Sequence, residues 1–210
     1  LTSIAGNSNL SSAEKQAFIQ SILKGANYVV GKSNNALGNQ NIVMAESSSA
    51  LGFDNIVLGK NNNAVGSGNF VQGQSSNAIG SNNTTSAISL QANAIGANNS
   101  ANGSWSNAIG TENTASAQSS SAFGLSNKST ANESVAFGSK NTATGTQSNA
   151  IGSNNTAVGQ GASAMGGNSA MITSIFGMES GARMPSIEPD NGVVAKIDGI
   201  DVESTATNWN

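Results

Sequence analysis

Carboxylates are the side chains of this 210-residue chain most suited to acid–base chemistry, because the chain has no histidine and no cysteine. Paired carboxylates act as acid and base in hydrolases, which requires two of them at a set separation. Here the acidic residues are scattered, and no two are placed to act as such a pair. We therefore expect no enzymatic activity and no cofactor or metal ion. The acidic residues considered are Glu46, Asp54, Glu112, Glu133, Glu179, Glu188 and Asp190.

A repeat of 14 residues must position these and all other side chains. The pattern Ala–apolar–Gly occurs ten times between Ala36 and Gly166, always 14 residues apart except for one step of 16. The longer step predicts a two-residue insertion in the loop Ser81–Ala92. Glycine or alanine often marks the middle of a repeat, and Asn follows the motif glycine by three residues in nine of ten copies. Because Gly and Asn tolerate left-handed turn conformations, each repeat predicts strand, turn, strand, turn, with strands of four or five residues.

Stacked repeats of this kind predict an all-β parallel solenoid with coils of about 14 residues. Alternate strand residues face opposite sides, so the motif Ala and Gly line a narrow interior with Val43, Val57 and Val71 of the second strand. The residue between Ala and Gly then points outward. Ten coils at about 4.8 Å give an apolar column roughly 48 Å long, which is too large to leave in water. We predict a self-association interface at Leu37, Leu51, Val65, Ile79, Ile95, Ile109, Phe123, Phe137, Ile151 and Met165. The alternative is a flat face that binds ice, carbohydrate or lipid.

The composition is consistent with such a thin fold. Charged residues make up 9% and aromatic residues 4% of the chain, so little material exists for a wide layered core. With a net charge of −3, a nucleic-acid partner is not expected, and we expect membrane contact only through an anchor absent from this fragment.

Four side chains are candidates for ligand binding. Trp105 occupies a loop position that is polar or Gly in the other repeats, and exposed aromatic residues are enriched at binding hot spots. The alternative is that Trp105 only folds over a neighbouring loop. Ile56, Leu58 and Phe70 lie on the outer face of the second strand in the early coils, where later coils are polar. The insertion in Ser81–Ala92 is a further candidate, although it could equally be slack in the solenoid.

The two ends differ from the repeat. Ser11–Lys24 predicts a short helix with a capping box at Ser11 and Glu14 and a C-terminal cap at Gly25. We expect this helix to cap or flank the first coils, the alternative being an exposed receptor-binding tip. Near the other end, Ser174–Gly177 reads as a last, shortened copy, and Asp198-Gly199 predicts the turn of a hairpin within Val193–Val202. The expected segments are 1–25, with the helix, 26–177, the solenoid, and 178–210, a closing segment.

The units with AIG cores, as in SNAIGSNNTAVGQGASAMGG, resemble the head repeats of trimeric autotransporter adhesins of the Yersinia YadA type. The resemblance covers residues 26–177. It implies a left-handed parallel β-roll, a homotrimer built on the outward apolar column, and display on the outer membrane of a Gram-negative bacterium. In one departure from the family, the residue before the motif Ala is mostly Asn or Ser. Without stalk heptads or a barrel, we expect the chain to be the head of a longer protein.

Through this resemblance we expect a non-enzymatic surface adhesin. Heads of this family bind host matrix proteins or host-cell receptors, or one another in autoagglutination. The ligands implied are collagen, fibronectin, laminin or a receptor of the carcinoembryonic-antigen-related (CEACAM) family. Two other functions remain open, a rigid spacer in a surface fibre and an ice- or glycan-binding solenoid.

Overall fold

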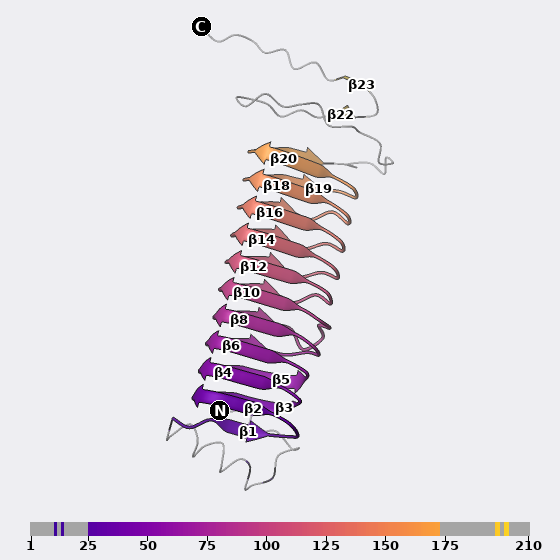
Figure 1. Cartoon of the computed structure of the whole chain (residues 1–210). Helices are drawn as coiled ribbons and strands as arrows, with labels where there is room; N and C mark the ends of the chain where they lie inside the picture. The colour runs from indigo at the N-terminus through magenta and orange to yellow at the C-terminus, as the bar shows by residue number, and fades with distance from the viewer. Residues whose placement is uncertain (1–10, 12–13, 15–24, 173–195, 198–199, 202–210) are drawn as a thin grey trace. The chain divides into compact units, whose positions relative to one another are not determined.

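The computed structural model describes residues 11, 14, 25–172, 196–197 and 200–201. The chain divides into two compact units, Leu1–Trp105 and Ser106–Asn210. In each unit the repeats form a parallel β-solenoid with coils of about 14 residues, as predicted (Figure 1). Every full coil contributes one strand to each of two sheets.

In the first unit, one sheet has the order β1-β3-β5-β7-β9-β11 and the other has the order β2-β4-β6-β8-β10. The strands pair in parallel and in the register of the repeat, so that Ala36 lies beside Ala50 and Gly38 beside Gly52. The strands are β1 (Tyr28–Val30), β2 (Asn35–Asn39), β3 (Ile42–Glu46), β4 (Ser49–Phe53), β5 (Ile56–Lys60), β6 (Asn63–Ser67), β7 (Phe70–Val71), β8 (Asn77–Ser81), β9 (Thr84–Thr85), β10 (Asn93–Ala97) and β11 (Ser100–Ala101).

The second unit repeats this arrangement. One sheet has the order β13-β15-β17-β19-β21 and the other has the order β12-β14-β16-β18-β20. The strands are β12 (Asn107–Thr111), β13 (Thr114–Ala115), β14 (Ser121–Leu125), β15 (Lys128–Ser129), β16 (Val135–Ser139), β17 (Thr142–Ala143), β18 (Asn149–Ser153), β19 (Thr156–Val158), β20 (Ser163–Gly167) and β21 (Ala170–Ile172).

The expected strand length is correct for only one of the two sheets. Every strand from β2 to β20 that carries the Ala–apolar–Gly motif has five residues, whereas most strands of the other sheet from β7 onward have two. After β13, for example, the chain turns at once, and the Ser120 hydroxyl closes the turn with hydrogen bonds to the backbone N–H and C=O of Ala117. Where a side chain satisfies the backbone hydrogen bonds of the turn, the chain need not continue as a strand.

The two-residue insertion lies in the predicted loop. β8 and β10 pair with a shift of 16, so that Ala78 lies beside Ala94. The extra residues form a turn at Ala87 and Ile88, closed by hydrogen bonds from the Ser89 N–H and hydroxyl to the Ser86 carbonyl at 3.1 and 2.7 Å. The turn therefore leaves the strands on either side of it in register.

The interior consists of the small residues that the alternation predicted. Val43, Val57 and Val71 are fully buried, as are the motif alanines from Ala64 to Ala150. The motif glycines are required by their surroundings. Gly52 has a φ of +123°, and a Cβ atom there would lie 2.0 Å from the Gly66 carbonyl oxygen of the next coil. Any side chain at this position would hold the coils apart.

A ladder of buried asparagines runs through one corner of the coils. The Asn three residues after the motif glycine is not the left-handed turn residue that we expected. The residue before this Asn has the left-handed conformation instead, as at Gln40 and Asp54 with φ of +58° and +54°. The Asn side chain points inward instead. Nδ2 of Asn55 donates to Oδ1 of Asn41 at 2.9 Å and to the Gly66 carbonyl at 2.9 Å. The ladder residues are Asn41, Asn55, Asn69, Asn83, Asn99, Asn113, Asn127, Asn141 and Asn155.

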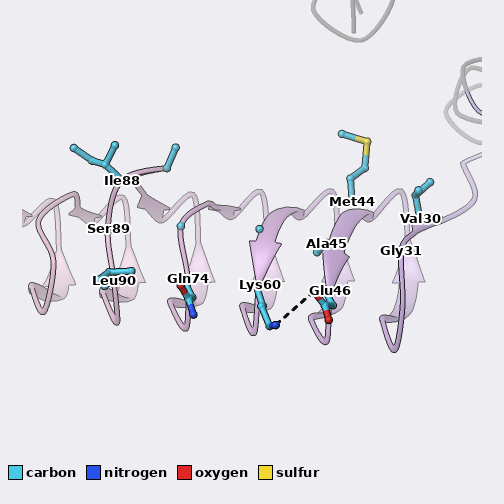
Figure 2. Close-up of a pocket in the computed structure, with 13 residues that line it drawn as sticks. Val30, Gly31, Met44, Ala45, Glu46, Lys60, Gln74, Ile88, Ser89 and Leu90 are labelled. Atoms are coloured by element: carbon cyan, nitrogen blue, oxygen red, sulfur yellow. Dashed lines mark ion pairs between the residues drawn. The ribbon is translucent and has the colours of Figure 1, made fainter. Parts of the chain in front are cut away.

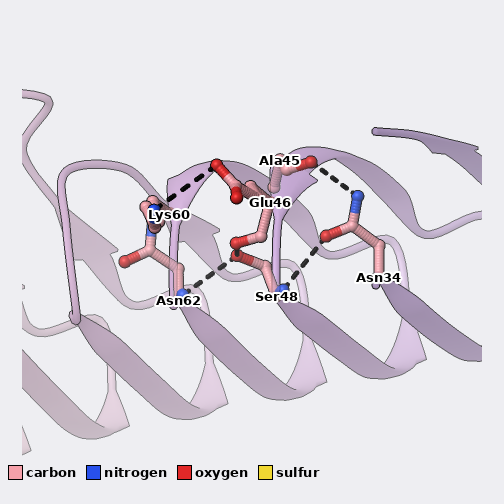
Figure 3. A network of polar contacts seen from close by, with 6 residues as sticks. All are labelled: Asn34, Ala45, Glu46, Ser48, Lys60 and Asn62. Carbon is pink, nitrogen blue, oxygen red and sulfur yellow. Dashed lines mark hydrogen bonds and ion pairs between the residues drawn. The ribbon is translucent and has the colours of Figure 1, made fainter. Parts of the chain in front are cut away.

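The opposite corner holds a second ladder of polar residues, part of which is shown in Figure 3. The backbone N–H of Ser48 donates to Oδ1 of Asn34 at 3.0 Å, and that of Asn62 donates to the Ser48 hydroxyl at 3.0 Å. Nδ2 of Asn34 reaches the Ala45 carbonyl at 2.6 Å. Every buried side-chain nitrogen or oxygen of the described residues has a hydrogen-bond partner. Both corners are therefore closed by polar contacts between successive coils.

The ends are described only in part. Lys196–Ile197 (β22) and Ile200–Asp201 (β23) pair antiparallel across Asp198-Gly199, which confirms the predicted hairpin. Gly25 has the left-handed φ of +67° expected of a C-terminal cap. Most of the predicted helix Ser11–Lys24 and the shortened copy Ser174–Gly177 lie outside the described residues. The boundaries at 25 and 177 stay predictions.

Candidate functional site

The outward apolar column is the largest regular apolar feature on the sheet that carries the motif. In the first unit, Leu37, Leu51, Val65 and Ile79 are 68%, 44%, 37% and 43% exposed, and Ile95 is half-buried. In the second unit, Phe137 and Met165 are 55% and 50% exposed, and the other three are half-buried. The predicted interface residues thus lie on one outer sheet face in each unit. Whether they join copies of the chain stays a prediction.

Two large side chains widen this column and were not predicted. The residue after the motif glycine also points outward, and it is polar or small in most coils. Phe53 in β4 and Leu125 in β14 are exceptions, at 51% and 45% exposed. In the second unit the rings of Phe123 and Phe137 lie 6.2 Å apart and tilted by 53°, a favourable aromatic contact. The alternation alone could have identified Phe53 and Leu125, since they lie two residues beyond the column.

A row of asparagines lies on the other side of the column. Nδ2 of Asn63 donates to Oδ1 of Asn77 at 2.9 Å, and Nδ2 of Asn77 donates to Oδ1 of Asn93 at 2.9 Å. These asparagines are the residues that precede the motif Ala. The side-chain amides of this row hydrogen-bond to one another along the solenoid, so these polar groups are satisfied beside the apolar column.

Trp105 is exposed, as predicted, with 46% of its surface accessible. Its φ is +58°, and the matching residues of other coils, such as Ser75 and Gln91, are also left-handed. A bulky residue is uncommon in that conformation. The backbone N–H of Trp105 donates to the Leu90 carbonyl at 2.7 Å, which places the Trp105 backbone next to the coil that carries the insertion.

The other three predicted ligand-binding residues lie together on the opposite sheet. Ile56 pairs with Phe70 across β5 and β7, and Leu58 lies two residues further along β5. All three are half-buried rather than fully exposed. The structure does not bring them next to Trp105, which lies in a corner outside the strands.

An open groove of about 680 Å³ follows the edge of that sheet in the first unit (Figure 2). Val30, Met44 and Ile88 stand on one side, and Glu46, Lys60, Gln74 and Leu90 stand on the other. Nζ of Lys60 lies 3.6 Å from Oε2 of Glu46, and both side chains are about half exposed. The sequence contained one signal for this groove, the insertion, because its other side chains come from successive coils, which lie 14 or more residues apart in the chain.

The N-terminal capping box is confirmed. The Ser11 N–H and hydroxyl donate to Oε2 of Glu14 at 2.8 and 2.7 Å, and the Glu14 N–H donates to the Ser11 hydroxyl at 3.2 Å. The hydrogen bonds from Ser11 hold the pKa of the Glu14 carboxyl below its usual value, the hydroxyl contributing most. The Tyr28 hydroxyl of β1 donates to the Glu14 carbonyl at 2.7 Å. Burial raises the pKa of the Tyr28 phenol, and the Glu14 charge raises it further.

Two of the described carboxylates make hydrogen bonds at the surface. Glu112 accepts a hydrogen bond from the Ser126 hydroxyl at 2.9 Å, and Glu133 accepts one from Gln147 at 2.9 Å, both at the surface. Within residues 11, 14, 25–172 and the two short C-terminal strands, no three acidic side chains group as a metal site would require. Glu179, Glu188 and Asp190 lie outside the described residues.

No family model matches the chain, and no curated protein matches it. Within the part of the chain that the structure describes, no helix has the length and apolar character needed to cross a lipid bilayer.

Proposed function

We propose that this chain is the head of a trimeric surface adhesin of the YadA type, displayed on the outer membrane of a Gram-negative bacterium. The observation that supports the proposal most is the outward apolar column on one sheet face of each unit. Its side chains are 37% to 68% exposed where they are most accessible, and they recur in every coil. The resemblance of the AIG repeats supplies the particular family and the trimer.

Burial of the column provides a driving force for association. A fully exposed Leu, Ile or Phe side chain gains about 1.5–3 kcal/mol on burial, so one that is half-buried gains about 1 kcal/mol. Ten such side chains give roughly 10 kcal/mol of gross stabilisation for each chain. Association opposes this with a cost of about 4–15 kcal/mol in lost freedom of motion. Burial of the column therefore offsets much of the cost of association.

The test of the assembly is the solution mass, measured by light scattering coupled to size exclusion. We expect wild-type residues 1–210 to elute at three times the chain mass of 20.9 kDa. The variant Phe137→Asp places a charge in the column, and we expect it to elute at the chain mass with an unchanged circular dichroism spectrum. Thr130→Asp introduces the same charge at an exposed residue outside the column and should keep the trimer. A wild-type monomer would contradict the proposal and favour an ice-, glycan- or lipid-binding face.

The adhesive function is tested separately. Three copies on one head strengthen weak single-site contacts by avidity, so modest affinities suffice. We expect the wild-type head to bind at least one of immobilised collagen, fibronectin, laminin or a CEACAM ectodomain, and we expect the Phe137→Asp monomer to bind it more weakly. A trimer that binds none of these four would favour the second candidate, a rigid spacer.

A further inference from the structure

The groove beside β3 and β5 is built by five successive coils of the first unit. Its floor is formed by small residues, Gly31, Ala45, Gly59 and Gly73, one from each of four coils. The two rows of larger side chains rise on either side of this floor (Figure 2). Because successive coils are about 4.8 Å apart, five coils span about 19 Å. The groove is therefore long, narrow and open to solvent.

The coil with the insertion ends the groove in an apolar group. Ile88, in the inserted turn, is 84% exposed, and Leu90 is 42% exposed. The row that contains Leu90 holds Glu46, Lys60 and Gln74 in the coils before it. Trp105 adjoins Leu90 through its backbone hydrogen bond. Among the coils of residues 25–105, the residues of this row are polar until the groove ends, where a large and exposed apolar side chain takes the place of a polar one.

The row of Lys32, Glu46 and Lys60 carries a positive excess, and of these three side chains Glu46 and Lys60 line the groove. Residues 25–105 contain four charged side chains, Lys32, Glu46, Asp54 and Lys60. The register that pairs Val30 with Met44 places Lys32 in the row of Glu46 and Lys60, so this row has two cations and one anion. The chain as a whole carries a charge of −3. The field of this row therefore favours an acidic group beside Lys60, in competition with the Glu46 carboxylate, which lies 3.6 Å from Nζ of Lys60.

We propose that the groove binds an extended polypeptide segment of about seven residues with an acidic side chain at its centre and apolar side chains at its ends. An extended chain rises about 3.3 Å per residue, so six steps match the span of about 19 Å. Two coils, about 9.6 Å, separate the Ile88 coil from the Lys60 coil, and two more separate Lys60 from Val30. These positions match a peptide in which an acidic residue is separated from an apolar residue on each side by two other residues.

This inference rests on the proposed adhesin function, because it identifies the part of a host protein that the head would recognise. The groove lies on the sheet of β1 to β11, whereas the proposed trimer interface lies on the sheet of β2 to β10. Binding and assembly therefore use different faces of the first unit, and variants can separate them.

The test uses residues 1–210 and two fluorescein-labelled synthetic peptides in a fluorescence anisotropy titration. One peptide has the sequence Leu-Ser-Ser-Asp-Ser-Ser-Leu, and the control has Lys in place of Asp. We expect the acidic peptide to bind at least about fivefold more tightly than the control at low salt. Lys60→Glu should reverse this preference, because the row then carries two anions around the binding position. Ile88→Ser should weaken both peptides about tenfold, since an apolar contact is lost. Thr130→Asp should change neither.

Equal binding of the two peptides, or a preference that Lys60→Glu leaves unchanged, would overturn the proposal. The same variants are then assayed on the matrix protein that the wild-type head binds. If the wild type binds a matrix protein and Lys60→Glu and Ile88→Ser bind it equally well, the groove is not the site although the adhesin function stands. If the peptides bind as expected but no matrix protein does, the groove stands and the adhesin function fails.

Discussion

Removal of one buried ladder asparagine should be among the most destabilising single changes in the second unit. Nδ2 of Asn127 donates to Oδ1 of Asn113 at 3.0 Å and to the carbonyls of Phe123 and Gly138 at 2.8 Å each. Its Oδ1 accepts from the N–H and Nδ2 of Asn141 at 2.9 and 3.0 Å. The variant Asn127→Ala removes all of these contacts, and the Phe123 and Gly138 carbonyls and the Asn141 N–H lose a partner, whereas Oδ1 of Asn113 keeps the Asn127 backbone N–H as its donor.

The magnitude follows from those partners. The buried Asn141 N–H loses its acceptor, which costs about 2 kcal/mol, and each carbonyl that loses its donor adds about 0.5–1 kcal/mol. We expect Asn127→Ala to lower the free energy of unfolding by about 3 kcal/mol in total. Asn132→Ala is the control, since Asn132 is exposed and its Oδ1 accepts one long hydrogen bond, 3.3 Å, from the Gln118 N–H. That change should cost less than about 1 kcal/mol.

The assay is urea denaturation followed by far-ultraviolet circular dichroism, at one protein concentration for all variants. Asn127→Asp adds a second comparison, because it keeps the acceptor atoms but buries a charge. Its carboxyl pKa should be raised by burial, so its stability relative to wild type should increase as pH falls through that raised pKa. Equal losses for Asn127→Ala and Asn132→Ala would refute the assignment of the ladder as a source of stability.

Two further changes test other parts of the fold. Gly124→Ala should lower the free energy of unfolding by more than about 2 kcal/mol, because φ is +113° and the new Cβ would lie 2.1 Å from the Gly138 carbonyl oxygen. A Cβ at Gly167 meets nothing within 4 Å, so Gly167→Ala should be nearly neutral. Thermal unfolding measures both variants, and equal melting temperatures would contradict the close approach of the coils. Tyr28 is the single tyrosine of the chain, so the ultraviolet absorbance of tyrosinate reports on it alone. The pKa of the Tyr28 phenol should lie above that of a free tyrosine and should fall in Glu14→Gln. The stability of the fold should be constant below the tyrosine pKa of the unfolded chain, about 10, and should decrease as pH rises above that value. An ordinary tyrosine pKa in the folded protein would show that Tyr28 is not buried.

Several features could be predicted from the sequence because they depend on residues close together in the chain. The period of 14 is visible in the spacing of the motif. The inward Ala and Gly and the outward column follow from strand alternation, which a single strand already obeys. The position of the insertion follows from one irregular step in the repeat. The capping box at Ser11 and Glu14 and the hairpin at Asp198-Gly199 are local in the same sense, since their partners lie three to five residues apart.

Other features depended on the stacking of coils, which brings together residues 14 or more positions apart. The recurrent Asn could be read as a turn residue from its type alone, but its partners at Asn41, Asn55 and Asn69 exist only once the coils lie in register. The second strand ends early at β13, where the Ser120 hydroxyl satisfies the backbone of the following turn. The groove required five coils and the inserted Ile88 to form its two sides. Alternation within a strand is a local property, whereas hydrogen bonds between coils and the spaces between their side chains are determined by tertiary structure.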